Sequence, residues 1–270
     1  TPEKLFLVDS PEGKRPESLS MTSCAETPHP PMAQQPSDPA AEAGGIYCHV
    51  PFCLQKCRYC DFYSTTRTHR IPDFIQALLS EIHLTDSSLA FDTLYFGGGT
   101  PSLLPVEGID TIISTIFKRF NMAGDPEITL EANPGAVSPD QLTGYRRAGV
   151  NRINLGVQSF GDERLFFLGR IHNAAQARQT LEDTRRAGFN NLGIDLIYGI
   201  PGQTVGSWLQ DLKEALIFAP EHLSCYLLTY EPGTPLSRDL ETRVSRPLSE
   251  TASAELFTLT REFLEDKGYF

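Results

Sequence analysis

The sequence RINLGVQ, at residues 152–158, decides the fold because aliphatic side chains alternate in it with small or polar residues. Aliphatic residues at positions 153, 155 and 157 alternate with Asn154, Gly156 and Gln158. Alternation over this length predicts a strand whose two faces meet different surroundings. The segments at 127–132 and 191–197 alternate in the same way and place Glu131 and Asp195 near their C-terminal tips.

Short strand-like runs alternate with stretches of helical period from Gly45 to the end of the chain. Strands are expected at residues 46–50, 93–96, 127–132, 152–158, 191–197 and 222–228. Helices are expected at residues 72–84, 106–120, 139–148, 174–187, 205–218 and 250–266. Parallel neighbouring strands require a crossover connection, usually a helix, so six βα units in succession predict an α/β fold with a parallel sheet.

The polar face of the three alternating strands distinguishes two forms of parallel sheet. A doubly wound sheet has helices on both faces and needs apolar residues on both. A curved sheet can instead keep small and polar groups on a concave face, with a ligand at the C-terminal ends of its strands. We therefore expect a partial (βα)6 barrel, similar to part of a TIM barrel, over residues 45–270.

The composition narrows the class of protein. Lys+Arg 23 against Asp+Glu 34 gives a net charge of −11, which argues against nucleic acid or anionic lipid as the main partner. Residues 1–44 hold eight of the 20 prolines, seven acids and three bases, which predicts a disordered leader unlike a transit or secretory signal. We expect a cytoplasmic location.

The two ends of the sequence suggest that it is a fragment. The chain begins at Thr1 without an initiator Met, and it stops at Phe270 directly after a predicted helix and its Gly268. We expect more chain beyond Phe270.

Three of the six cysteines lie within eight residues, in a loop after the first predicted strand. Cys53, Cys57 and Cys60 have the spacing C-x3-C-x2-C. Three thiolates can bind three corners of a 4Fe–4S cluster and leave the fourth iron open to a small molecule. A zinc site is an alternative, completed by His49 or Cys48, and unliganded thiols are another.

A run of glycines marks the tip of the second predicted strand. Residues 95–101 read YFGGGTP. Consecutive glycines allow a ligand to approach the backbone closely, although a tight turn between strand and helix also uses Gly and Pro.

These residues resemble the radical S-adenosylmethionine (SAM) superfamily, and within it the oxygen-independent coproporphyrinogen-III-oxidase-like family. The resemblance rests on Tyr47, the PFC start of the cysteine loop at residues 51–53 and the glycine run. It is strengthened by LEANP at 130–134, GVQSF at 156–160, LGR at 168–170 and DLIYGIPGQT at 195–204. It covers residue 46 to the end of the chain and implies a partial barrel of the radical SAM type.

The resemblance also implies roles for single residues. Cys53, Cys57 and Cys60 would bind the 4Fe–4S cluster, whose open iron chelates the amino and carboxylate groups of SAM. The remaining residues would line the SAM pocket: Tyr47 and Tyr59 beside the cluster, Gly98, Gly99 and Thr100 at the methionine amine, Glu131 at the ribose, Arg170 at the carboxylate, and Gln158 and Asp195 to complete the pocket. Arg170 as a surface arginine and Asp195 as a loop cap are the alternatives.

Phe62 distinguishes two branches of the family. The decarboxylating oxidases that the chain resembles have a further cysteine two residues after the third, where this sequence has Phe62. Phe at that position resembles the haem-chaperone (HemW-like) branch, whose haem-binding motif follows a stretch similar to residues 267–269. This implies haem or porphyrin as a ligand, haem-accepting respiratory proteins and an electron donor as partners, and possible peripheral contact with membrane proteins. The alternative is coproporphyrinogen III oxidase; no residue is assigned a catalytic role.

Overall fold

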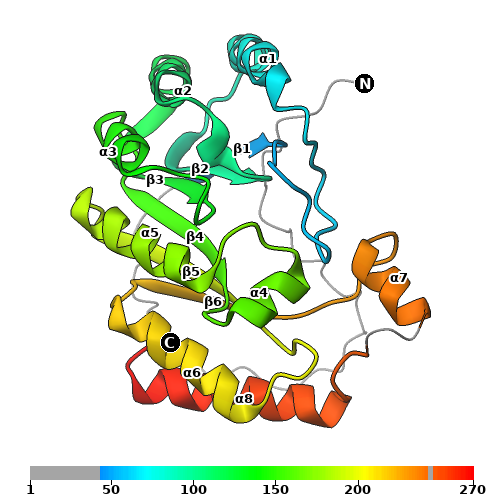
Figure 1. The fold of residues 1–270 in the computed structure, drawn as a ribbon. Helices are drawn as coiled ribbons and strands as arrows, with labels where there is room; N and C mark the ends of the chain where they lie inside the picture. The colour runs from blue at the N-terminus through cyan, green and yellow to red at the C-terminus, as the bar shows by residue number, and fades with distance from the viewer. Residues whose placement is uncertain (1–42, 243–245) are drawn as a thin grey trace, which may run out of the picture.

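The computed structural model describes residues 43–242 and 246–270, so the predicted leader lies outside the described residues up to position 42. Its six strands form one parallel sheet in the order of the sequence. The strands are β1 (Gly44–Val50), β2 (Ala90–Gly98), β3 (Asn121–Ala132), β4 (Arg152–Gln158), β5 (Asn191–Tyr198) and β6 (His222–Leu227). The predicted partial barrel is confirmed: the sheet curves as a half-barrel (Figure 1).

Most of the helices form the outer layer (Figure 1). The helices are α1 (Ile71–Leu84), α2 (Val106–Arg119), α3 (Pro139–Arg147), α4 (Asp162–Leu168), α5 (Ala174–Arg186), α6 (Val205–Ile217), α7 (Pro235–Glu241) and α8 (Glu250–Asp266). Of these, α4 and α7 lie beside the loop that follows β1 (Figure 1). Two single 3-10 turns, Thr68–Arg70 and Pro101–Leu103, precede α1 and α2. No helix among these residues is both long and apolar enough to cross a membrane.

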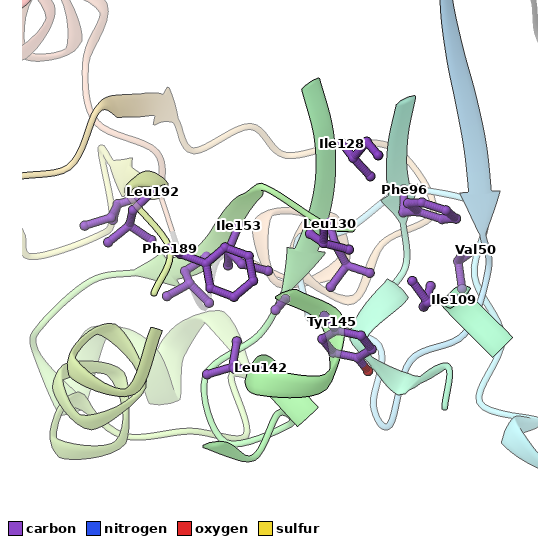
Figure 2. Packing of buried hydrophobic residues seen from close by; sticks show 14 of the residues in the cluster. Val50, Phe96, Ile109, Ile128, Leu130, Leu142, Tyr145, Ile153, Phe189 and Leu192 are labelled. Carbon is purple, nitrogen blue, oxygen red and sulfur yellow. The ribbon is translucent and has the colours of Figure 1, made fainter. Parts of the chain in front are cut away.

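The main core lies between the sheet and the outer helices. Aliphatic residues predicted to face the helices are fully buried there, including Leu130 and Ile153 on neighbouring strands. Figure 2 shows these two side chains with Leu142 and Tyr145 of α3 packed near them. Burying an aliphatic side chain of this size contributes about 1.5–3 kcal/mol, so the alternation in the sequence fixes which face of each strand turns outward.

Helix boundaries follow local chemistry. Ser138 accepts a hydrogen bond from the Gln141 amide at the start of α3, and Asn173 accepts one from the Gln176 amide at the start of α5. Each cap satisfies an amide that the first turn of a helix leaves without a partner. Gly149, just after α3, has φ +105°, a conformation that favours glycine at the end of a helix.

The structure differs from the sequence prediction in two ways. Several strands are longer: β1 begins at Gly44, inside the predicted leader boundary, β2 covers nine residues and β3 covers 12. Two short helices, α4 and α7, were not predicted. Each has seven residues, too few for a helical period to emerge from the sequence.

Candidate functional site

A single cavity at the C-terminal ends of the strands contains almost all of the predicted site residues. Its volume is about 580 Å³. It is lined by every predicted residue except Tyr47, namely Cys53, Cys57, Tyr59, Cys60, Gly98, Gly99, Thr100, Glu131, Gln158, Arg170 and Asp195. A pocket of this size at the C-terminal end of a parallel barrel is the expected place for a ligand.

Glu131 is held by donors from the neighbouring strand. Its Oε1 accepts a hydrogen bond from the Tyr95 hydroxyl at 2.7 Å, and its Oε2 accepts one from the Gly98 amide at 3.1 Å. Burial raises the pKa of Glu131 to about 7, and the nearby charge of Asp195 raises it further. The hydrogen bonds from Tyr95 and Gly98 act in the opposite direction and lower this pKa. Each oxygen retains a lone pair, so the carboxylate can accept a further hydrogen bond from a ligand hydroxyl.

Asp195 lies on the same concave face, next to Asn154. The Asn154 Nδ2 atom donates to Asp195 Oδ2 at 2.8 Å, and burial raises the pKa of Asp195. Both residues line the cavity rather than the following loop. Asp195 therefore faces the cavity and does not act as a loop cap.

Two buried acceptors in the cavity test whether SAM fits. Within the described part of the chain, Asn154 Oδ1 and Gln158 Oε1 have no hydrogen-bond partner. Leaving such a group unpaired costs about 1–3 kcal/mol. Gln158 also has a left-handed backbone (φ +68°), which costs a non-glycine residue on the order of 1–2 kcal/mol. The amino and hydroxyl groups of a nucleoside are donors that satisfy such acceptors, so the residues fit SAM.

The cysteine loop forms the opposite wall of the cavity. Thr100 Oγ1 lies 3.8 Å from Cys53 Sγ, and Asn133 Nδ2 donates to Thr100 Oγ1 at 2.8 Å. Burial raises the pKa of the Cys60 thiol. No three His, Cys, Asp or Glu side chains in the described ranges are grouped to hold a single metal ion. Three thiolates can bind three corners of a 4Fe–4S cluster, whereas structural zinc takes four protein ligands.

Arg170 joins the cysteine loop to the end of β4. Its Nη1 donates to Cys57 Sγ at 3.3 Å, and its Nη2 donates to the Gly156 carbonyl at 2.8 Å and to Asn133 Oδ1. Arg170 is therefore not an ordinary surface arginine, while its pairing with a SAM carboxylate stays a prediction.

The glycine run allows β1 and the cysteine loop to approach β2. A Cβ atom at Gly97 would lie 2.8 Å from the Tyr47 ring, one at Gly98 2.7 Å from His49, and one at Gly99 2.6 Å from the Phe52 carbonyl. Gly98 also has φ +111°. The sequence predicted that a ligand would approach these glycines closely. In the structure, the groups that approach them are Tyr47, His49 and Phe52 of the protein.

The two predicted tyrosines differ in position. Tyr59 lines the cavity, and burial raises its pKa. Tyr47 lies behind the wall: its ring stacks on Tyr95 with centroids 5.9 Å apart, and its hydroxyl lies 3.3 Å from His49 Nδ1. Tyr47 therefore reaches the site through Tyr95, the residue that holds Glu131.

Sequence reasoning did not single out Tyr95 or Asn133, both of which organise the site. A signal for each was present in the sequence. Tyr95 precedes the glycine run and occupies an alternate position in its strand, and Asn133 follows Glu131 at the tip of the next strand. Their contacts to Glu131, Thr100 and Arg170 depend on tertiary structure.

Several known proteins are similar to this chain over most of its length. The chain is 42% identical over 197 residues to the heme chaperone HemW of Escherichia coli, covering 70% of this chain and 51% of that protein. It is 32% identical to the mitochondrial radical S-adenosyl methionine domain-containing protein 1 of Mus musculus, covering 88% of this chain and 55% of that protein. The chain thus spans about half the length of these relatives.

A solved structure has a similar fold. The coproporphyrinogen III oxidase HemN of Escherichia coli, described as a radical SAM enzyme, superposes with a TM-score of 0.74 at 28% identity. The match covers 83% of this chain and 52% of that one.

Residues 47–215 match the model of the radical SAM superfamily. This range includes the three cysteines, the glycine run and the polar tips of β3, β4 and β5. The cofactors of the superfamily are a 4Fe–4S cluster and SAM. The chain belongs to the radical SAM superfamily, and its relatives place it in the HemW-like branch.

Proposed function

We propose that the protein is a haem chaperone that binds a 4Fe–4S cluster, SAM and haem, and that it delivers haem to haem-accepting respiratory proteins. The single observation that carries the proposal is Phe62 at the rim of the cavity. Phe62 is 69% exposed and lies two residues after Cys60, where the decarboxylating oxidases that the chain resembles have a cysteine. A phenylalanine offers no thiol for ligation or reaction, and the named HemW relatives favour the same reading.

The residues that would hold the cofactors divide the cavity between them. Cys53, Cys57 and Cys60 would bind the cluster, with Arg170 donating a hydrogen bond to Cys57 Sγ. Glu131 and Asp195 would orient the ribose. When bound, the cluster and SAM supply one-electron reductive cleavage of the sulfonium, a reaction that needs an electron donor as a partner.

The remaining residues would bind and orient the cofactor. Gln158 Oε1 and Asn154 Oδ1 would accept hydrogen bonds from the nucleoside. Gly98, Gly99 and Thr100 would border its methionine end, and Tyr59 would pack beside the cluster. Tyr47 would act from behind the wall, through Tyr95. Residues 45–270 would form the SAM-binding core.

The test compares two activities of the full-length protein after anaerobic reconstitution. Haem binding is followed by its absorbance, and haem transfer by spectral change in an apo-haemoprotein acceptor. We expect saturable haem binding and transfer, and no conversion of coproporphyrinogen III to protoporphyrinogen IX. A Cys57→Ala variant gives the background oxidation. SAM-dependent formation of protoporphyrinogen IX above this background would contradict the proposal.

Coproporphyrinogen III oxidase is the second candidate. It is favoured by the superposition with HemN, which is described as a coproporphyrinogen III oxidase, at a TM-score of 0.74. The same assay decides between the two, because the oxidase converts its substrate and consumes SAM in the process.

A cytoplasmic location is part of the proposal. The support is the composition of residues 1–44, with seven acids and three bases, which differs from the Arg-rich composition of transit peptides. Fractionation of cells that express the full-length protein tests this location. Recovery of the protein in mitochondria, the location named for the mouse relative, would contradict the proposal.

A further inference from the structure

The cysteine loop provides hydrogen-bond partners for the end of α4. Three carbonyls there accept from the loop: Phe167 from Arg58 Nη1, Leu168 from the Arg58 amide and Gly169 from Gln55 Nε2, each at 3.2 Å. The last carbonyls of a helix have no partner within the helix and must find one elsewhere. Residues between the first and third cysteines supply those partners here.

The same loop also contacts the start of α7. The Leu236 amide donates to the Arg58 carbonyl at 2.9 Å, and Arg58 Nη2 forms an ion pair with Asp239. The Arg58 guanidinium lies 5.6 Å from the centroid of the Phe167 ring. Arg58, between Cys57 and Cys60, therefore bridges two helices that follow different strands of the barrel. Figure 1 shows α4 and α7 beside the lower end of the loop that follows β1.

Two further features fix this bridge. Gly169 has φ +73°, and a Cβ atom at this position would lie 2.8 Å from Arg58 Cγ, so only glycine meets both demands. Beneath the bridge lies a second hydrophobic core, separate from the main one. It consists of Leu168, Ile197, Ile200, Leu228 and Leu236, with Tyr59, Phe167 and Tyr230 packed against it.

We propose that Arg58 and Asp239 are positioning residues for the iron–sulfur cluster. They hold the segment that carries Cys57 and Cys60 against α4 and α7, without touching the cluster themselves. The proposal rests on the proposed function insofar as it requires the cluster. A loop that folding has already ordered loses less conformational entropy when the cluster binds. Release of iron requires the segment to open, so the bridge slows release.

The test measures how fast a chelator removes iron from the anaerobically reconstituted full-length protein. Asp239→Asn keeps the shape of the side chain and removes its charge. We expect release about tenfold faster than in the wild type, which corresponds to about 1.4 kcal/mol. Asp239→Glu restores the charge and should return the rate toward that of the wild type. Glu214→Gln is the matched control, because Glu214 has a side-chain exposure of 13% against 22% for Asp239, and its partner Arg178 lies over the Phe160 ring as Arg58 lies over Phe167.

A second measurement separates positioning from general stability. The unfolding midpoint of the apoprotein should shift no more in Asp239→Asn than in Glu214→Gln. Equal iron release in these two variants, or a lower midpoint with unchanged release, would overturn the inference. If Asp239→Asn does not fold, Arg58→Lys replaces it in the same assay, with the same expected increase. A wild-type protein that takes up no iron would instead overturn the proposed function.

Discussion

The two walls of the cavity are built by different means. Glu131, Asn154 and Asp195 lie on strands in the middle of the sheet, and Glu131 pairs directly with Asn154 in the register of β3 and β4. The cysteine loop has no regular structure apart from an isolated bridge between Phe52 and Thr65. Its position depends on side chains and helix ends from distant parts of the chain. The strand wall is set by the sheet, and the loop wall by tertiary contacts.

The largest expected effect is on the loop wall. Cys57→Ala removes one of three cluster ligands, so iron and sulfide after anaerobic reconstitution should fall to background. Metal and sulfide analysis measures this. The matched control is Cys225→Ala on β6, distant from the loop in sequence and outside the lining of the cavity, which should retain the cluster. Equal cluster content in the two variants would contradict the assignment.

The next effect concerns the turn that follows β4 in the strand wall. The buried Asp211 carboxylate accepts hydrogen bonds from the Ser159 hydroxyl at 2.8 Å, and from the Phe160 amide and Arg164 at 2.9 Å. Asp211→Ala leaves these donors without a partner and should lower the free energy of unfolding by about 3–5 kcal/mol. Urea denaturation measures this, with Glu182→Ala in an exposed ion pair as control. A loss below 1 kcal/mol would show that the network does not hold the turn.

A smaller effect is expected for SAM binding to the strand wall. Glu131→Gln replaces a charged acceptor by a neutral one, which should weaken SAM binding about tenfold to a hundredfold while iron content is unchanged. Calorimetry on the reconstituted protein measures the Kd. Glu127→Gln, four residues earlier on the same strand and outside the lining of the cavity, is the control and should bind SAM as the wild type does. An unchanged Kd for Glu131→Gln would remove Glu131 from the site.

The smallest effect is the dependence of this binding on pH. Because burial raises the pKa of Glu131 to about 7, the carboxylate forms only as the pH rises through that value. If only the carboxylate binds ribose, SAM affinity should increase about tenfold from pH 6 to pH 8. The same titration with Glu131→Gln should give a flatter profile. A parallel pH dependence in both proteins would assign the effect to another group.

The sequence predicted the strand wall well because it rests on local rules. The inward direction of Glu131 and Asp195 follows from the two-residue period of a strand, and their common edge follows from parallel strands. Glu131, Gln158 and Asp195 all line the cavity, as predicted. Family resemblance supplied their roles, which still require the binding experiments.

The loop wall was predicted only as a set of ligands. The spacing of Cys53, Cys57 and Cys60 indicated a cluster, but nothing in it indicated which residues hold the loop. Arg58 and Asp239 are 181 positions apart, and the helix that carries Asp239 is too short to be recognised. The position of Tyr47 behind Tyr95 was hidden for the same reason, because it depends on how two strands pair.

By itself, the sequence determined the order of the six strands and of the longer helices and the face of each alternating strand that turns inward, and it predicted the ligands of a metal site. These properties depend on periodicity and spacing within a few residues. Only the tertiary structure decided which distant groups meet: Arg58 with Asp239, Arg170 with Cys57, and Asp211 with the turn after β4. Such pairs carry no local pattern, since folding brings them together through the packing of whole elements.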